Sequence, residues 1–260
     1  MVSGQGGLEI QNRVISNKKI KDSRIKKREK RKTSADRGTR PQENAMGNFN
    51  SFLNILNTRE KKIIRELNSP FKIQSFLDSI PYSAESVYRC PLRVLRDRTA
   101  HCFDGALFAA ALMRQTGQPS LILDMIPNDR DDDHLLALYK RNSHWGAVAK
   151  SNFTGLRFRE PIFRTIRELV LSYFEQYYNV YREKTLRGYT VPLNLNSFDS
   201  MNWMIQDEPL DAIAQRLDEI RHILFLTPEM AAGLSPVDDR LYQAGLQGSD
   251  EKGLYKPQDK

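Results

Sequence analysis

The chain has 260 residues and a formal net charge of +8, and this charge is concentrated at one end. Residues 1–45 carry 13 of the 40 Lys and Arg and 5 of the 32 Asp and Glu, which leaves 27 of each sign in residues 46–260. The folded part therefore has no overall preference for nucleic acid. Two cysteines are too few for a secreted disulfide scaffold, and no stretch resembles a signal peptide or a membrane span. We expect a soluble, cytoplasmic protein without membrane contact.

Residues 1–45 are predicted to be a disordered basic tail. The segment NKKIKDSRIKKREKRKTSADRGTR has almost nothing apolar to bury, so it cannot offset the entropy of ordering. Nucleic-acid contact is expected only through this tail, because basic arms bind phosphates without sequence specificity. A solvated extension without a binding role is the alternative, as is a start at Met46. After the tail we expect a single domain over 46–227 and a flexible tail over 228–260.

Helical signals open the predicted domain. Ser69 and Pro70 are typical of a helix start, and apolar residues follow at helical spacing: Ile73, Phe76, Leu77 and Ile80. A short helix is expected after Ser83. Pro91 predicts an irregular segment over 88–100.

The clearest helix begins at Cys102 and runs to about Thr116, where Gly117 and Pro119 end it. A buried strand is predicted over 120–125, an acidic loop over 126–133, and a hairpin of two strands over 134–140 and 145–150. Helical spacing predicts a long helix over 160–178 and a last helix within 207–225. This order predicts an α+β fold in which a small antiparallel sheet packs against helices.

Cys102 is the candidate nucleophile because it precedes a helix. Backbone N–H groups and the helix dipole at such a position favour the thiolate, although free cysteines are often core residues. A nucleophilic cysteine needs a base, and His134 begins a strand about thirty residues later. His101 is the rival base. His144 and His222 are interpreted as structural or exposed.

Metal and cofactor motifs are not evident. The acidic loop places Asp129, Asp131 and Asp133 at alternate positions, but a calcium loop would need a glycine at the sixth position and a glutamate where Lys140 stands. Zinc spacing and a phosphate-binding glycine loop are missing from the sequence, so we expect no cofactor and no metal. A group of arginines is interpreted as surface ion pairs ahead of an anion site: Arg157, Arg159, Arg164 and Arg167.

The sequence around these residues resembles the transglutaminase-like superfamily of the papain-like cysteine fold. The similarity lies in CFDGALFAAALMRQTGQP, DDDHLLALY and HWGAVAKSN, which cover roughly residues 80–155. Cys102, Gly105, Ala106, His134 and Trp145 follow the order of the family pattern. The rest of the chain is similar to an uncharacterised bacterial group of such domains. One departure is that the family's Asp, which holds the His, is missing after Trp145, so Ser151 or Asn152 would take its place.

The resemblance implies cysteine chemistry on a peptide, amide or ester. Cys102 would attack the carbonyl, His134 would act as base and then acid, and Ser151 or Asn152 would orient the imidazole. The backbone N–H of Cys102 would help to bind the oxyanion. Hydrolysis and acyl transfer both stay open. A catalytically inactive domain that serves as a binding or scaffold module is the alternative, because the Asp is missing.

Overall fold

The computed structural model describes residues 41–256, which belong to one compact unit. The predicted basic tail lies mostly in residues 1–40, outside the described residues. Its last five residues form the start of helix α1 (Pro41–Asn54). Within residues 41–256, no helix is both long and apolar enough to cross a membrane.

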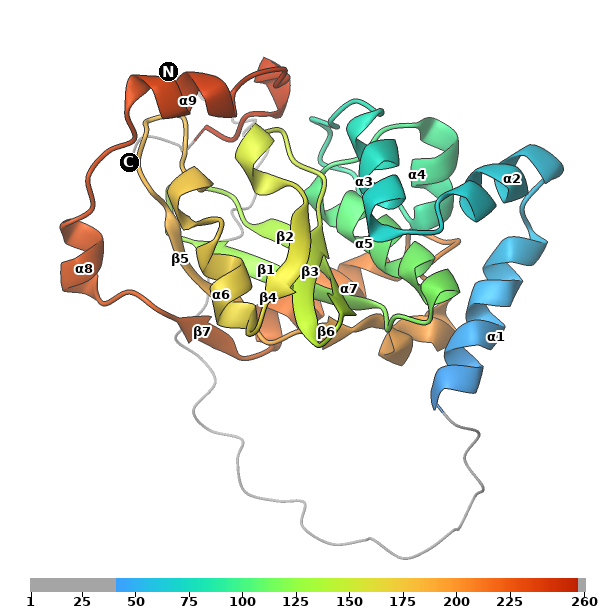
Figure 1. The fold of residues 1–260 in the computed structure, drawn as a ribbon. Coiled ribbons are helices and arrows are strands. Elements are labelled where there is room, and N and C mark those ends of the chain that lie inside the picture. The colour runs from blue at the N-terminus through green and yellow to red at the C-terminus, as the bar shows by residue number, and fades with distance from the viewer. Residues whose placement is uncertain (1–40, 257–260) are drawn as a thin grey trace, which may run out of the picture. The chain divides into compact units, whose positions relative to one another are not determined.

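Helices precede, cover and follow a central sheet (Figure 1). The helices before the sheet are α2 (Thr58–Glu66), α3 (Pro70–Asp78), α4 (Pro91–Asp97) and α5 (Cys102–Met113). Those after its first strands are α6 (Ile166–Leu171), α7 (Leu210–Glu219), α8 (Pro228–Ala232) and α9 (Asp239–Gly245). Single 3₁₀ turns include Thr154–Leu156, Phe174–Gln176 and Glu251–Gly253.

The sheet is antiparallel throughout its described pairs and has the order β4-β3-β2-β1-β5-β7, with β6 also pairing β1. Its strands are β1 (Leu121–Pro127), β2 (His134–Arg141), β3 (His144–Val148), β4 (Arg159–Phe163), β5 (Leu186–Thr190), β6 (Leu193–Asn194) and β7 (His222–Leu224). Mixed helix and antiparallel sheet confirm the α+β prediction. The hairpin prediction is also confirmed, because β2 and β3 meet at Asn142 and Ser143, both with positive φ as a two-residue hairpin turn requires.

The two faces of the sheet pack against different layers. On β2, Leu135 and Ala137 join the cluster that contains α5, whereas Leu136 and Leu138 join a second cluster with Tyr173. Side chains alternate along a strand, so these two sets point to opposite faces. Every residue of α5 is buried, which makes this helix the centre of the larger layer. Helix α6 lies on the other face, over β3 and β4 (Figure 1).

Three element predictions are wrong. Residues 91–97 form α4 instead of an irregular segment, because Pro91 occupies the first helical turn, where proline is tolerated. No helix follows Ser83 before α4 in this described segment. The predicted helix over 160–178 is divided into β4, α6 and a 3₁₀ turn. Pro161 lies in edge strand β4, and the Thr165 hydroxyl caps α6 by accepting from the Glu168 N–H.

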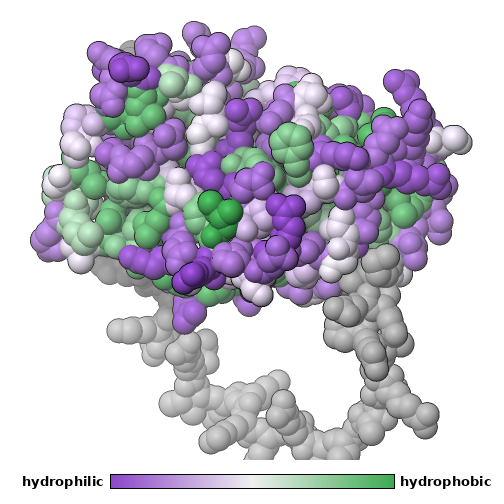
Figure 2. All heavy atoms as spheres, viewed as in Figure 1, coloured by the Kyte–Doolittle hydropathy of each residue, from purple (hydrophilic) through white to green (hydrophobic). Residues whose placement is uncertain are grey.

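The C-terminal region also differs from expectation. The helix predicted within 207–225 is α7, which ends at Glu219, and the chain then continues as β7. Residues 228–256, expected to form a flexible tail, include α8, α9 and a 3₁₀ turn. Val237 is buried in this region and its N–H donates to the Arg182 carbonyl. Over the viewed face, hydrophobic residues occur in small groups among hydrophilic ones (Figure 2).

Candidate functional site

Cys102 is the first residue of α5, and its neighbours form the helix cap. The Nδ1 atom of His101 accepts from the Phe103 N–H at 3.2 Å, and the Asp104 carboxylate accepts from the His101 N–H at 3.3 Å. This reciprocal arrangement is a capping box, with an imidazole in place of the usual hydroxyl. Burial, followed by the charge of Arg89, lowers the pKa of His101 to about 4. His101 is therefore used as a neutral cap beside Cys102.

The Cys102 thiol is buried and protonated. Its Sγ donates to the Asp133 carbonyl oxygen at 3.9 Å, and the residue is 8% exposed. Burial raises the pKa of the thiol well above its ordinary value, and the charges of Asp132 and Asp133 raise it further. The helix N-terminus favours a thiolate, but desolvation and two nearby carboxylates act in the opposite direction and outweigh it.

His134 is the first residue of β2, so its chain segment meets Cys102. Its ring, however, lies with the second cluster: Nε2 is 2.7 Å from the Leu156 carbonyl oxygen, and the Tyr177 ring is edge-on at 6.4 Å. A carbonyl only accepts, so we assign the proton to Nε2, and Nδ1 is an acceptor. Burial lowers the pKa of His134 to about 4. The structure thus brings the two segments together and turns the imidazole toward the sheet face opposite α5.

Ser151 and Asn152, the predicted orienting residues, bond to other groups. The Ser151 hydroxyl accepts from the Phe153 N–H at 3.0 Å. The Asn152 side chain donates to the Asp250 carbonyl and accepts from the Asp250 N–H, both at 2.8 Å. The partner of His134 is instead the Leu156 carbonyl. A main-chain partner of this kind carries no signal in the sequence.

Tyr82 is a site residue that sequence analysis missed. A bridge to Ala100 places it beside the segment that leads into α5. Burial is the main cause that raises the pKa of Tyr82, and the phenol also interacts with the backbone and the thiol of Cys102. The phenol therefore lies directly against the candidate nucleophile.

Asp124 is a second missed residue, on the same side of the sheet as α5. It is 3% exposed, its backbone N–H donates to the Thr190 hydroxyl at 3.0 Å, and its Oδ1 has no hydrogen-bond partner among the described residues. Burial raises the pKa of Asp124 well above its ordinary value, followed by the charge of Asp133 and a hydrogen bond with it. The sequence did hold a signal, because Asp124 is the one charged residue in the apolar run SLILDM.

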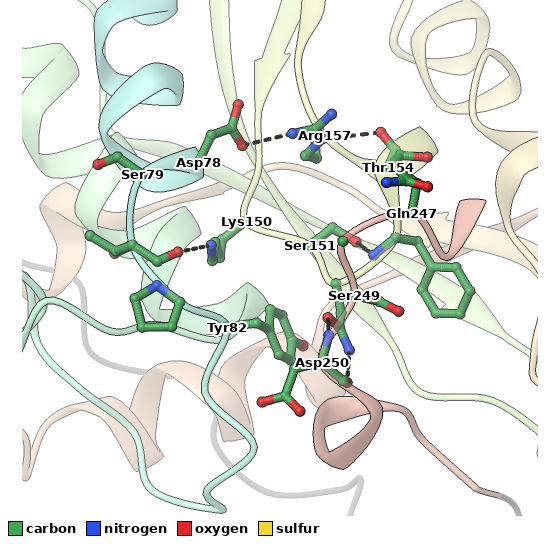
Figure 3. A pocket seen from close by; sticks show the side chains of 15 residues that line it. Asp78, Ser79, Tyr82, Lys150, Ser151, Thr154, Arg157, Gln247, Ser249 and Asp250 are labelled. Atoms are coloured by element: carbon green, nitrogen blue, oxygen red, sulfur yellow. Dashed lines mark hydrogen bonds and ion pairs between the residues drawn. The ribbon is translucent and has the colours of Figure 1, made fainter. Parts of the chain in front are cut away.

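Two cavities adjoin these residues. The larger, about 410 Å³, is lined by Tyr82, Lys150, Asn152 and Asp250 among others (Figure 3). The smaller, about 60 Å³, is lined by His134, Asp131, Asp132, Asp133 and again by Tyr82, Ser151 and Asn152. Tyr82 and residues 151–153 line both cavities.

Lys150 is the buried cation of the larger cavity. Its Nζ donates to the carbonyl oxygens of Leu77 and Ile80 at 2.8 and 2.6 Å, at the C-terminal end of α3 (Figure 3). Burial lowers the pKa of Lys150 to about 8. Arg157 pairs with Asp78 at 3.3 Å in the same cavity. Within residues 41–256, no group of three or more His, Cys, Asp or Glu side chains is placed to hold a metal ion.

Comparisons with known proteins give a distant likeness of fold. No family model matches the chain, and no curated protein matches it. Among solved structures, LapG of Legionella pneumophila is similar at 12% identity, with 66% of this chain and 97% of that chain covered and a TM-score of 0.34. EGTA-treated LapG gives the same identity, coverage and TM-score.

Proposed function

We propose that the chain is a cysteine-dependent enzyme that attacks an amide or ester carbonyl through Cys102, with His134 as the base. The observation that supports this is the meeting of two distant segments: Cys102 Sγ lies 3.9 Å from the carbonyl oxygen of Asp133, the residue before His134. A thiol at the start of a 12-residue helix lies beside N–H groups that have no partner within the helix. His101 already caps the Phe103 N–H, so the Cys102 N–H is the group proposed to bind the oxyanion.

The proposed reaction proceeds from a protonated thiol. His134 leaves the Leu156 carbonyl and turns about the start of β2, and its Nδ1 takes the Cys102 proton as Sγ bonds to the substrate carbonyl carbon. The imidazolium then gives that proton to the leaving amine or alcohol, which leaves an acyl-enzyme. His134 then takes a proton from the water or amine that attacks the acyl carbon, and returns it to the Cys102 sulfur as the carbon–sulfur bond breaks. Either acceptor completes the cycle, as hydrolysis or as acyl transfer.

The pH dependence of thiol alkylation tests this proposal. Cys90 serves as an internal comparison, because burial raises the pKa of Cys90 to about 12. If His134 is the base, His134→Ala slows the alkylation of Cys102 near neutral pH and leaves Cys90 unchanged. His222→Ala, at an exposed residue of β7, is the matched control and should change neither rate. Equal Cys102 profiles in the wild type and in His134→Ala would remove His134 from the mechanism.

A binding or scaffold module without catalysis is the second candidate. It is supported by the direction of the His134 ring, toward the sheet face opposite α5, and by the raised pKa of the Cys102 thiol. This candidate predicts that both cysteines stay unreactive until the chain unfolds.

Nucleic-acid contact through residues 1–45 is a separate proposal that rests on their charge. Salt-dependent DNA binding that disappears with that segment would support it. The absence of binding at low salt would end it.

A further inference from the structure

A segment of the C-terminal region lies against Tyr82 and Asn152. Residues 247–255, here called the C-terminal strap, line both cavities: Gln247, Gly248, Ser249 and Asp250 contribute to the larger, Gly253 and Tyr255 to the smaller. Figure 3 shows Ser249 and Asp250 among the residues that line the larger cavity, together with Tyr82 and Ser151.

Asn152 holds the strap through its main chain. One amide side chain makes both available contacts with Asp250, donating to the carbonyl and accepting from the N–H. A side-chain amide that pairs with both the N–H and the carbonyl of one residue recognises the main chain, whatever the side chain of that residue is. Recognition of an extended peptide requires contacts of this kind. Asn152 therefore acts as a main-chain recognition point. In this structure the residue bound there is Asp250 of the same chain.

Gly253 places the strap on Tyr82. A Cβ added at Gly253 would lie 2.7 Å from Tyr82 Cδ1 and 3.1 Å from Asn152 Nδ2, so only a glycine permits this approach. Tyr82 in turn lies against Cys102. Strap, Tyr82 and thiol thus form three successive layers.

The C-terminal strap has few contacts that would resist its release from the domain. None of its residues is buried, and two hydrogen bonds with Asn152 hold it, whereas the preceding helix α9 contains the buried Gly245. Segments with few buried apolar contacts open at low free energy without global unfolding.

We propose that the C-terminal strap is an autoinhibitory element that occupies the main-chain recognition point at Asn152 and, through Tyr82, blocks the approach to Cys102. This inference rests on the proposed function of Cys102. A peptide segment that competes for Asn152 would displace the strap and open the site.

Two variants of the full chain and one control test the strap. Gly253→Ala introduces the contact with Tyr82, and Asn152→Ala removes both hydrogen bonds. Gly233→Ala is the matched control, since its Cβ would lie 3.6 Å or more from any neighbour. We expect both strap variants to raise the alkylation rate of Cys102 by iodoacetamide at fixed pH by roughly 10-fold. Amide deuterium exchange in residues 247–255 should accelerate in parallel, and the control should match the wild type.

Each other outcome overturns the strap proposal. Faster exchange with unchanged alkylation would show that the released strap did not block Cys102, and unchanged exchange would show that these contacts do not hold it. An Asn152→Ala variant that slows alkylation would make Asn152 an orienting residue of the base instead. Failure of the proposed function appears separately, in the His134→Ala profile, because every strap variant keeps His134.

Discussion

Replacing Asp124 by asparagine tests whether the carboxyl groups of Asp124 and Asp133, near Cys102, share a proton at neutral pH. Burial and the neighbouring Asp133 raise the pKa of Asp124 well above its ordinary value. The folded chain then binds this proton more tightly than the unfolded chain. The contribution to stability is complete below about pH 4 and declines as the pH rises toward the folded pKa.

An asparagine at this position has nearly the same shape and no proton to lose. Its amide N–H can donate to Asp133 where the carboxyl O–H does now. Relative to the wild type, the free energy of unfolding of Asp124→Asn should therefore rise by about 1.4 kcal/mol per pH unit above about pH 4, for as long as Asp124 stays protonated in the folded chain.

Urea denaturation at a series of pH values from about 5 to about 8 measures this slope. Asp131→Asn is the matched control, because burial raises the pKa of Asp131 only to about 6, so its advantage should stop growing above that pH. A difference between Asp124→Asn and the wild type that is the same at every pH would refute the assignment of a bound proton to Asp124.

Two further substitutions test the packing around the site. Burial lowers the pKa of His134 to about 4, so stability present above about pH 6.5 should be lost as the pH falls toward 4, by at most about 1.4 kcal/mol per unit. Thermal denaturation of His134→Gln, which keeps a donor for the Leu156 carbonyl, should lack this loss, and equal acid sensitivity would contradict the burial of the imidazole. Gly105→Ala would bring a Cβ within 2.3 Å of Lys150 Cβ and should destabilise the chain by about 1–3 kcal/mol in urea. Gly47→Ala in α1 meets nothing within 4 Å and serves as its control. A Gly105→Ala variant as stable as the wild type would show that the segment after β3 moves away from α5 easily.

The sequence predicted elements well where a local signal decided them. Ser69 caps α3 as expected, and Gly117 ends the turn after α5 in the left-handed conformation. Prediction failed where tertiary contacts overrode periodicity. The apolar spacing over 160–178 suggested one helix, but Ile162 lies exposed on an edge strand and Arg159 is tied to the Gly155 and Ser172 carbonyls. Pairing with β3 fixes that strand, and no local pattern encodes it.

The candidate site was likewise predicted only in part from the sequence. Sequence order predicted that Cys102 and His134 begin neighbouring elements, and the structure places these segments together. The face on which His134 lies depends on register, because a shift of one residue would exchange it with Asp133. The register, with His134 opposite Met125, follows from the whole sheet. Tyr82 and the C-terminal strap reach the site from residues far apart in the chain, which a local motif cannot reveal.

The strand order constrains how this chain emerges during synthesis. Strand β1 lies between β2, which follows it closely, and β5, which begins at Leu186. A nascent chain that has already exposed α5 and the hairpin of β2 and β3 therefore carries an open β1 edge until β5 is made, which begins at Leu186, whereas β3 ends at Val148. Unpaired edges of this kind favour association between chains, so the period before Leu186 leaves the ribosome is when a chaperone would matter most.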